Sequence, residues 1–69
     1  MRLSARNQIA GTVRDVSLGG VMAKVTVAID GGHTLVSTIT RDAALDLALA
    51  EGDAVTVVIK STEVMIGKD

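Results

Sequence analysis

The sequence has no cysteine and a single histidine among its 69 residues. The lack of cysteine excludes disulfides, and it also excludes a zinc site built from Cys and His ligands. A chain of this length forms one domain, whose own core is small. Disulfides and zinc sites stabilise many small domains, and this chain can form neither. We therefore expect copies of the chain to associate.

Phenylalanine, tyrosine and tryptophan are also absent, although 48% of the residues are hydrophobic. Single-stranded nucleic acids are usually bound by aromatic stacking platforms in basic grooves, and this chain has no aromatics and a net charge of −1. We therefore predict no nucleic-acid partner. No apolar run is long enough to span a membrane, and no signal-peptide core is present, so we expect a cytoplasmic protein without a membrane partner.

Short runs of Val, Ile and Thr separated by Gly and Asp indicate strands and turns. Residues 9–16 form the first predicted strand. Strict alternation over residues 21–29 places five apolar side chains on one face of the second. Asp30-Gly31-Gly32 is a hairpin signal, and residues 33–40 return as an antiparallel partner.

The pattern changes after the third predicted strand. Residues 41–49 are rich in Ala and Leu and predict a short helix, with Thr40 as its N-cap. Residues 54–60 form a fourth strand, and residues 63–66 a short closing strand. This order predicts an all-β fold, an OB-like five-stranded barrel with one short helix, because an open sheet would leave its edges bare.

The sequence gives no support for catalysis. His33 lies in a turn, where an exposed residue is the simplest interpretation, and no serine has the context of a nucleophile elbow. The paired glycines at residues 19–20 and 31–32 lack the spacing of a phosphate-binding loop. We predict that the protein is not an enzyme.

Two polar clusters stand at the ends of the predicted barrel, at residues 4–8 and 60–62. Ser4 and Arg6 belong to the first cluster, and Lys60 and Ser61 to the second. A dianion removed from water needs opposite charge and several directed donors, which these side chains and backbone N–H groups supply. The plainer interpretation is that the cations are solvated surface charges and the hydroxyls are strand-end hydrogen bonders.

A resemblance favours the first interpretation. Residues 4–8 (SARNQ), followed by Gly11 and Val13, together with residues 60–67 (KSTEVMIG), are similar to the Mop domain of the molbindins. The resemblance spans essentially all of residues 1–69. It implies an OB-like subunit that assembles into a hexamer, a trimer of dimers, and holds molybdate or tungstate between subunits for storage or buffering.

The resemblance also assigns residues. Ser4 and Arg6 match the family's N-terminal ligand motif, Lys60 and Ser61 match the C-terminal one, and Thr40 matches a hydroxyl near the same site. The metal is bound as its oxyanion, so no side chain ligates it directly, and no organic cofactor is implied. We expect Arg6 and Lys60 from adjoining copies to neutralise a tetrahedral dianion, which hydroxyl and N–H groups orient.

The family also implies a second oxyanion site at Gly19, Gly20 and Val21. This chain departs from the family pattern there, because Met22 stands where Asn is frequent. A hydroxyl residue that some members carry is replaced by Ala43. We therefore rank the cluster at the chain ends above Thr40, and Thr40 above the glycine loop.

Two other functions are compatible with the predicted fold. One is an OB-fold nucleic-acid-binding module, which the absence of aromatics disfavours. The other is a purely structural oligomerisation module, in which the end clusters form salt bridges between copies and no ligand binds.

Overall fold

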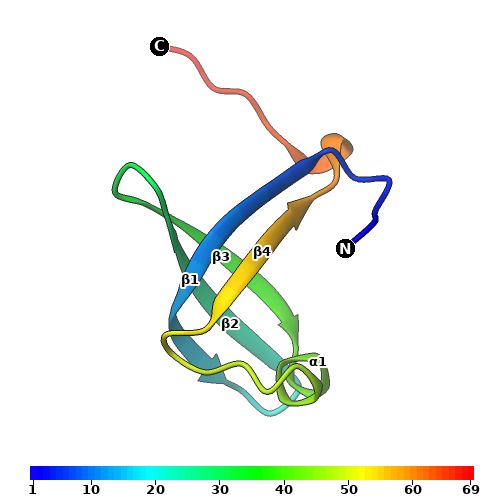
Figure 1. Ribbon diagram of the computed structural model, residues 1–69, viewed down its shortest axis with the longest axis vertical. Coiled ribbons are helices and arrows are strands. Elements are labelled where there is room, and N and C mark those ends of the chain that lie inside the picture. The colour runs from blue at the N-terminus through cyan, green and yellow to red at the C-terminus, as the bar shows by residue number, and fades with distance from the viewer.

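A long first strand organises the sheet. The computed structural model describes residues 1–69 and contains one four-stranded antiparallel sheet of order β3-β2-β1-β4 (Figure 1). Its elements, in chain order, are β1 (Asn7–Leu18), β2 (Met22–Ile29), β3 (His33–Thr40), α1 (Arg41–Asp46), β4 (Ala54–Ile59) and the short 3₁₀ helix η1 (Ser61–Glu63).

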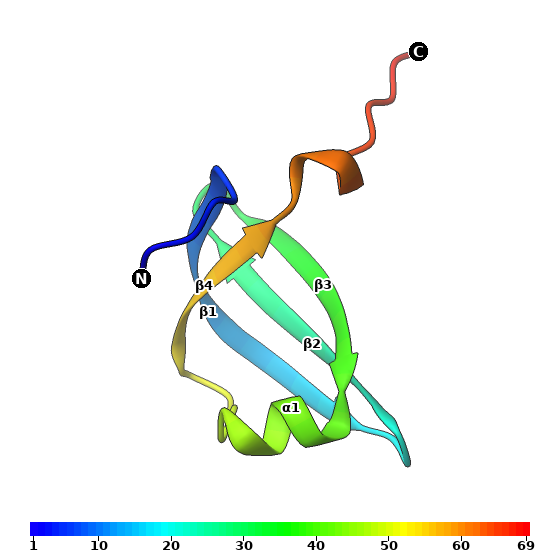
Figure 2. The ribbon, with the colours of Figure 1, turned by 90° about the vertical axis from the view of Figure 1, so that its right-hand side faces the viewer.

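The two halves of β1 pair with different strands. Its first half pairs with β4, from Asn7 opposite Ile59 to Thr12 opposite Ala54. Its second half pairs with β2 and ends with Leu18 opposite Ala23. The register with β2 shifts next to Val13, as expected at a β-bulge, which bends a strand and increases its twist. The sheet therefore curves strongly about β1 (Figure 2).

Gly11 lies where β1 passes closest to β2. A Cβ atom at this position would come within 2.5 Å of the Val27 Cγ1 atom and 2.8 Å of the Ala28 carbonyl oxygen. A real Cβ cannot approach backbone so closely without displacing it. The curvature of β1 therefore requires glycine at position 11.

The core is small and lies on the concave side of the sheet. Val13, Val25 and Val27 are at most 4% exposed, and only five of the 69 residues are buried. The predicted alternation of β2 is confirmed for Ala23, Val25 and Val27. Val21 was predicted to share their face but is 76% exposed, because it lies in the bend before β2 and has no partner strand.

The predicted hairpin and helix cap are confirmed. Gly31 and Gly32 adopt φ values of 86° and 78°, which glycine tolerates without strain, and they join β2 to β3. The Thr40 hydroxyl accepts a hydrogen bond of 3.1 Å from the Ala43 N–H and caps α1. In Figure 2, α1 lies across the lower end of the sheet. Neither helix has the length and apolar character needed to cross a membrane.

The prediction of a closed five-stranded barrel is wrong, whereas an all-β fold with one short helix is confirmed. The predicted closing strand at residues 63–66 is absent. Residue 63 ends η1, and the chain then runs away from the sheet (Figures 1 and 2). A β-strand requires a neighbour for its backbone groups, and this segment has none within its own chain.

The other element boundaries differ by a few residues. β1 extends two residues beyond the predicted range 9–16 at each end because its polar ends pair with β4 and β2. β4 ends at Ile59 rather than at residue 60. Helix α1 ends at Asp46, short of the predicted residue 49, and Ala48 has a φ of 50°, outside the helical region.

We predict that Gly11→Ala destabilises the protein by about 1–3 kcal/mol, since the added methyl group overlaps β2. The free energy of unfolding in urea at fixed protein concentration measures this cost. Gly20→Ala is the matched control, because a Cβ at Gly20 meets nothing within 4 Å. Equal stability of the two variants would show that β1 can shift away from β2.

Candidate oxyanion-binding site

The pairing of β1 with β4 brings the two ends of the chain together. Asn7 and Ile59 form the last pair of this ladder. Arg6 directly precedes β1 and Lys60 directly follows β4, so both lie just beyond this pair. Ser4 precedes Arg6 by two residues, and Ser61 follows Lys60 at the start of η1. In Figure 1 the N-terminal segment and η1 meet at the same end of the sheet. We call these four residues the terminal cluster.

Local hydrogen bonds shape both halves of the terminal cluster. The Gln8 side-chain Nε2 donates to the Ala5 carbonyl oxygen at 2.7 Å and fixes the turn that carries Arg6. On the other half, the Glu63 N–H donates to the Lys60 carbonyl oxygen at 2.9 Å and closes η1. Each half of the terminal cluster therefore has a local hydrogen bond that supports its backbone.

The side chains of the terminal cluster are not engaged within the chain. The four side-chain hydrogen bonds of the protein involve Gln8, Arg41, Thr40 and Asp53. Members of the terminal cluster are all exposed, and Glu63 is the nearest acid in sequence. The arrangement thus presents two cations and two hydroxyl groups with unused donors, open to solvent on one side.

A second cluster lies at the opposite end of β1. The Arg41 backbone N–H donates to the Val21 carbonyl oxygen at 2.7 Å, and the Arg41 Nη1 donates to the Gly19 carbonyl oxygen at 3.0 Å. These bonds place Thr40 beside the loop of Gly19, Gly20 and Val21, and we call this group the glycine-loop cluster. Thr40, which was predicted to lie near the chain-end site, is therefore adjacent to the loop that was predicted for the second site.

Thr40 does not join the terminal cluster within one chain. It pairs with Met22, next to the end of β1 that follows Leu18, whereas Arg6 precedes the start of β1. A strand rises about 3.3 Å per residue, so the 12 residues of β1 run for roughly 40 Å along the strand between these two sites. Thr40 can contribute to an ion bound at Arg6 only from another copy of the chain.

Sequence reasoning missed Arg41. A cation in the first turn of a helix is opposed by the helix dipole, and this unfavourable position is the one signal that marked Arg41 as having another role. In the loop before β2, neither Gly19 nor Gly20 has a positive φ. Glycine is needed at position 19 because the backbone passes close to Met22 there. A Cβ atom on residue 19 would lie 2.9 Å from the Met22 carbonyl oxygen.

Comparison with known proteins supports one family. Residues 3–66 match the TOBE domain. The chain is 48% identical over 66 residues to molybdenum-pterin-binding protein 3 of Clostridium pasteurianum, covering 96% of this chain and 97% of that protein. Among solved structures, it superposes on apo MopII from Clostridium pasteurianum with a TM-score of 0.92 and 42% identity, covering 97% of this chain and all of that one.

A second similar structure was solved with its ligand. It is the cytoplasmic molybdate-binding protein ModG with molybdate bound, which is 43% identical to this chain with a TM-score of 0.84, over 88% of this chain and 43% of ModG. The fold of this chain thus occurs in a class of small β-sheet domains. The chain belongs to the TOBE domain family and, within it, to the Mop proteins, as the sequence resemblance indicated.

We predict that Thr40→Ala lowers the free energy of unfolding by about 1 kcal/mol, because α1 loses its side-chain N-cap. Thr40→Ser keeps the capping oxygen and should retain most of the stability. Urea denaturation of both variants measures the difference. Equal stability of Thr40→Ala and the unmodified protein would mean that the hydroxyl does not serve as a cap.

Proposed function

We propose that this protein binds molybdate or tungstate, without catalysis, at sites between copies of the chain. The observation that supports the proposal is the register of β1 with β4, because its last pair, Asn7 with Ile59, directly adjoins Arg6 and Lys60 in the sequence. Molybdate and tungstate are tetrahedral dianions at neutral pH, so two cations match their charge. The names of similar proteins, which refer to molybdenum-pterin or molybdate, point in the same direction.

The ion requires more than one copy. Every side chain of the terminal cluster is exposed in the single chain, so an ion held there by one copy would remain in water. In high dielectric, ion pairs contribute little, whereas an enclosed site of lower dielectric strengthens each contact. We therefore place the ion where the terminal clusters of two adjoining copies face each other, so that Arg6 of one copy and Lys60 of the other both reach it.

The hydroxyl groups set the orientation of the ion. Ser4, Ser61 and nearby backbone N–H groups each donate to an oxygen of a fully ionised oxyanion, which accepts hydrogen bonds and donates none. Thr40 of a further copy reaches the same ion in this arrangement. Sulfate shares the charge and shape of molybdate, so selection of the larger ion depends on the size of the enclosed cavity.

We propose that the biological role is storage or buffering of the oxyanion in the cytoplasm, in a hexamer built as a trimer of dimers. A binding domain with no catalytic apparatus can change the free concentration of its ligand only by mass action. The glycine-loop cluster, where Arg41 supplies the cation, is the proposed second class of site.

Titration calorimetry with molybdate tests the terminal cluster. Arg6→Ala and Lys60→Ala each remove charge-assisted hydrogen bonds of about 1.5–3 kcal/mol, which corresponds to about a ten- to hundredfold loss of affinity. Tungstate should follow molybdate, and sulfate should give little heat.

Arg14→Ala is the matched control, because it removes the same charge from an exposed position on β1 outside the terminal cluster. Its affinity for molybdate should equal that of the unmodified protein. If Arg6→Ala bound molybdate as tightly as Arg14→Ala does, the terminal cluster would not be the binding site.

A further inference from the structure

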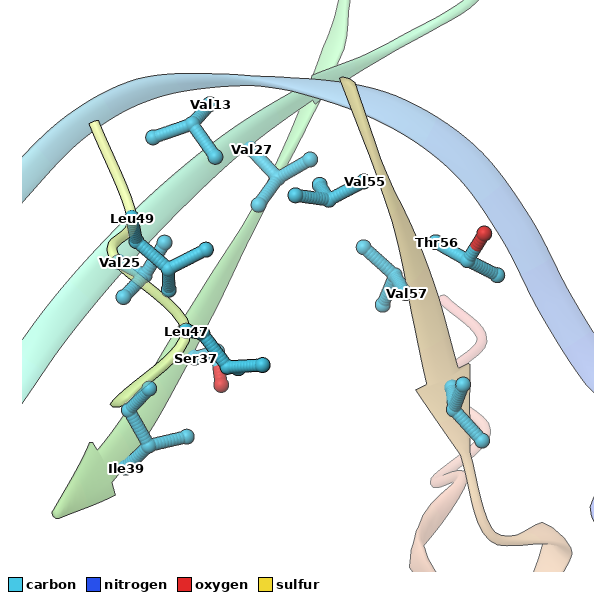
Figure 3. A pocket seen from close by; sticks show the side chains of 11 residues that line it. Val13, Val25, Val27, Ser37, Ile39, Leu47, Leu49, Val55, Thr56 and Val57 are labelled. Atoms are coloured by element: carbon cyan, nitrogen blue, oxygen red, sulfur yellow. The ribbon is translucent and has the colours of Figure 1, made fainter. Parts of the chain in front are cut away.

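The concave side of the sheet is an open apolar groove that does not suit an oxyanion. The groove has a volume of about 190 Å³ and exposes one side of the small core formed by Val13, Val25 and Val27. Among the side chains that line it, only Ser37 and Thr56 carry hydroxyl groups, and none carries a charge (Figure 3). An anion in this groove would lose its hydration without compensation. The groups that suit an ion lie outside the groove.

Arg41 joins the glycine loop, residues 19–21, to the first turn of α1. Thr40 pairs with Met22 at the end of β3 and caps α1, so Arg41 is the residue at which the chain turns from strand to helix. Its backbone N–H donates to the Val21 carbonyl oxygen at 2.7 Å, and its Nη1 donates to the Gly19 carbonyl oxygen at 3.0 Å. One residue thus occupies two of the three carbonyl groups of the loop.

The Arg41 side chain is held by the loop and not by an acid. The four side-chain hydrogen bonds of the protein include none between a cation and a carboxylate. Residues 17–22 contain no Asp or Glu. The bond to the Gly19 carbonyl oxygen is therefore the only hydrogen bond that fixes this guanidinium group.

The N–H groups of the loop are free where its carbonyl groups are occupied. The Gly19 N–H donates to the Met22 carbonyl oxygen at 2.7 Å, whereas the N–H groups of Gly20 and Val21 have no acceptor in the chain. Both residues are exposed, and a Cβ at Gly20 would meet nothing within 4 Å, so the space beside the loop is open. Neighbouring backbone N–H groups without acceptors are suitable donors for an anion, whereas carbonyl oxygens repel it.

We infer that Arg41 is a positioning residue for the oxyanion. It holds the carbonyl oxygens of Gly19 and Val21, so that the N–H groups of Gly20 and Val21 remain as donors to the ion. The inference rests on the proposed function, which places a second class of site at the glycine-loop cluster. The charge of Arg41 attracts the anion, while its Nη1 hydrogen bond stays with the loop.

This role depends on the shape of arginine as well as on its charge. A guanidinium group is planar and presents its donors in fixed directions, whereas the ammonium of lysine is a compact charge on a flexible stem. Arg41→Lys keeps the charge but holds the Gly19 carbonyl less firmly, and Arg41→Met loses both properties. Both variants keep the Arg41 backbone N–H and the Thr40 cap, so α1 should still form.

Nuclear magnetic resonance of the ¹⁵N-labelled full chain, titrated with molybdate, tests the inference at the atoms concerned. Lys60→Ala serves as the background, so that the remaining binding reports on the glycine-loop cluster. We expect larger shifts of the Gly20 and Val21 amide signals than of the Arg41 Nε–H signal. The largest shift at Arg41 would show that it binds the ion directly, and unmoved Gly20 and Val21 signals would show that the loop does not bind it. Either result would overturn the inference.

Calorimetry with molybdate in the same Lys60→Ala background measures the effect on affinity. Arg41→Met should weaken the remaining binding about tenfold, and Arg41→Lys should weaken it about threefold, because a less firmly held loop offers its donors less well. Arg14→Met is the matched control, since Arg14 lies on β1 outside both clusters, and it should bind like the background. Arg41→Lys with the affinity of the background would show that charge alone suffices and would refute the positioning role.

Failure of this inference is distinguishable from failure of the terminal cluster. If the Lys60→Ala background bound no molybdate at all, the second class of site would be absent and the role of Arg41 would be refuted, whereas the terminal cluster would stand. If Lys60→Ala and Arg6→Ala kept the full affinity and Arg41→Met lost it, the terminal cluster would be refuted and the role of Arg41 would stand.

Discussion

The antiparallel pairing of β1 with β4 is the contact on which the candidate site depends. Arg6 and Lys60 are separated by most of the sequence, and they become neighbours only because Asn7 pairs with Ile59. That register in turn depends on the curvature of β1, which pairs with β4 before Thr12 and with β2 after it. The close approach at Gly11 permits this change of partner. Gly11, in the middle of β1, thus affects where Arg6 and Lys60 lie at the end of the strand pair.

Both the core and the candidate site of a single chain are open to solvent. The concave core is open between β3 and β4, and the terminal cluster is open to solvent. We propose that a second copy, whose terminal cluster faces this one, encloses the ion. The 3₁₀ helix η1 carries Lys60 at its N-cap and leads into the exposed apolar residues 64–66. Association and oxyanion binding are therefore expected to stabilise each other by mass action.

Local signals predicted much of the fold. Alternation identified β2 and its inward valines, the Asp30-Gly31-Gly32 turn identified the hairpin, and Thr40 was recognised as a cap. Each of these features is decided by residues that are neighbours in sequence. The closing strand at residues 63–66 was wrong because strand formation depends on a partner strand, and the local pattern of a segment does not say whether such a partner is available. Thr40 was grouped with Arg6 because the family resemblance implies that both lie near one ion. The fold sets them at opposite ends of β1, so both can contact one ion only if they come from different copies.

Crystals grown with molybdate, with anomalous diffraction recorded at the molybdenum absorption edge, would test the central claim most directly, because the metal itself is located. The account predicts molybdenum between copies of the chain. Oxyanion oxygens should lie within about 3 Å of the Arg6 guanidinium of one copy and the Lys60 ammonium of another. Molybdenum held by residues of a single copy, or at a position remote from both cations, would contradict it.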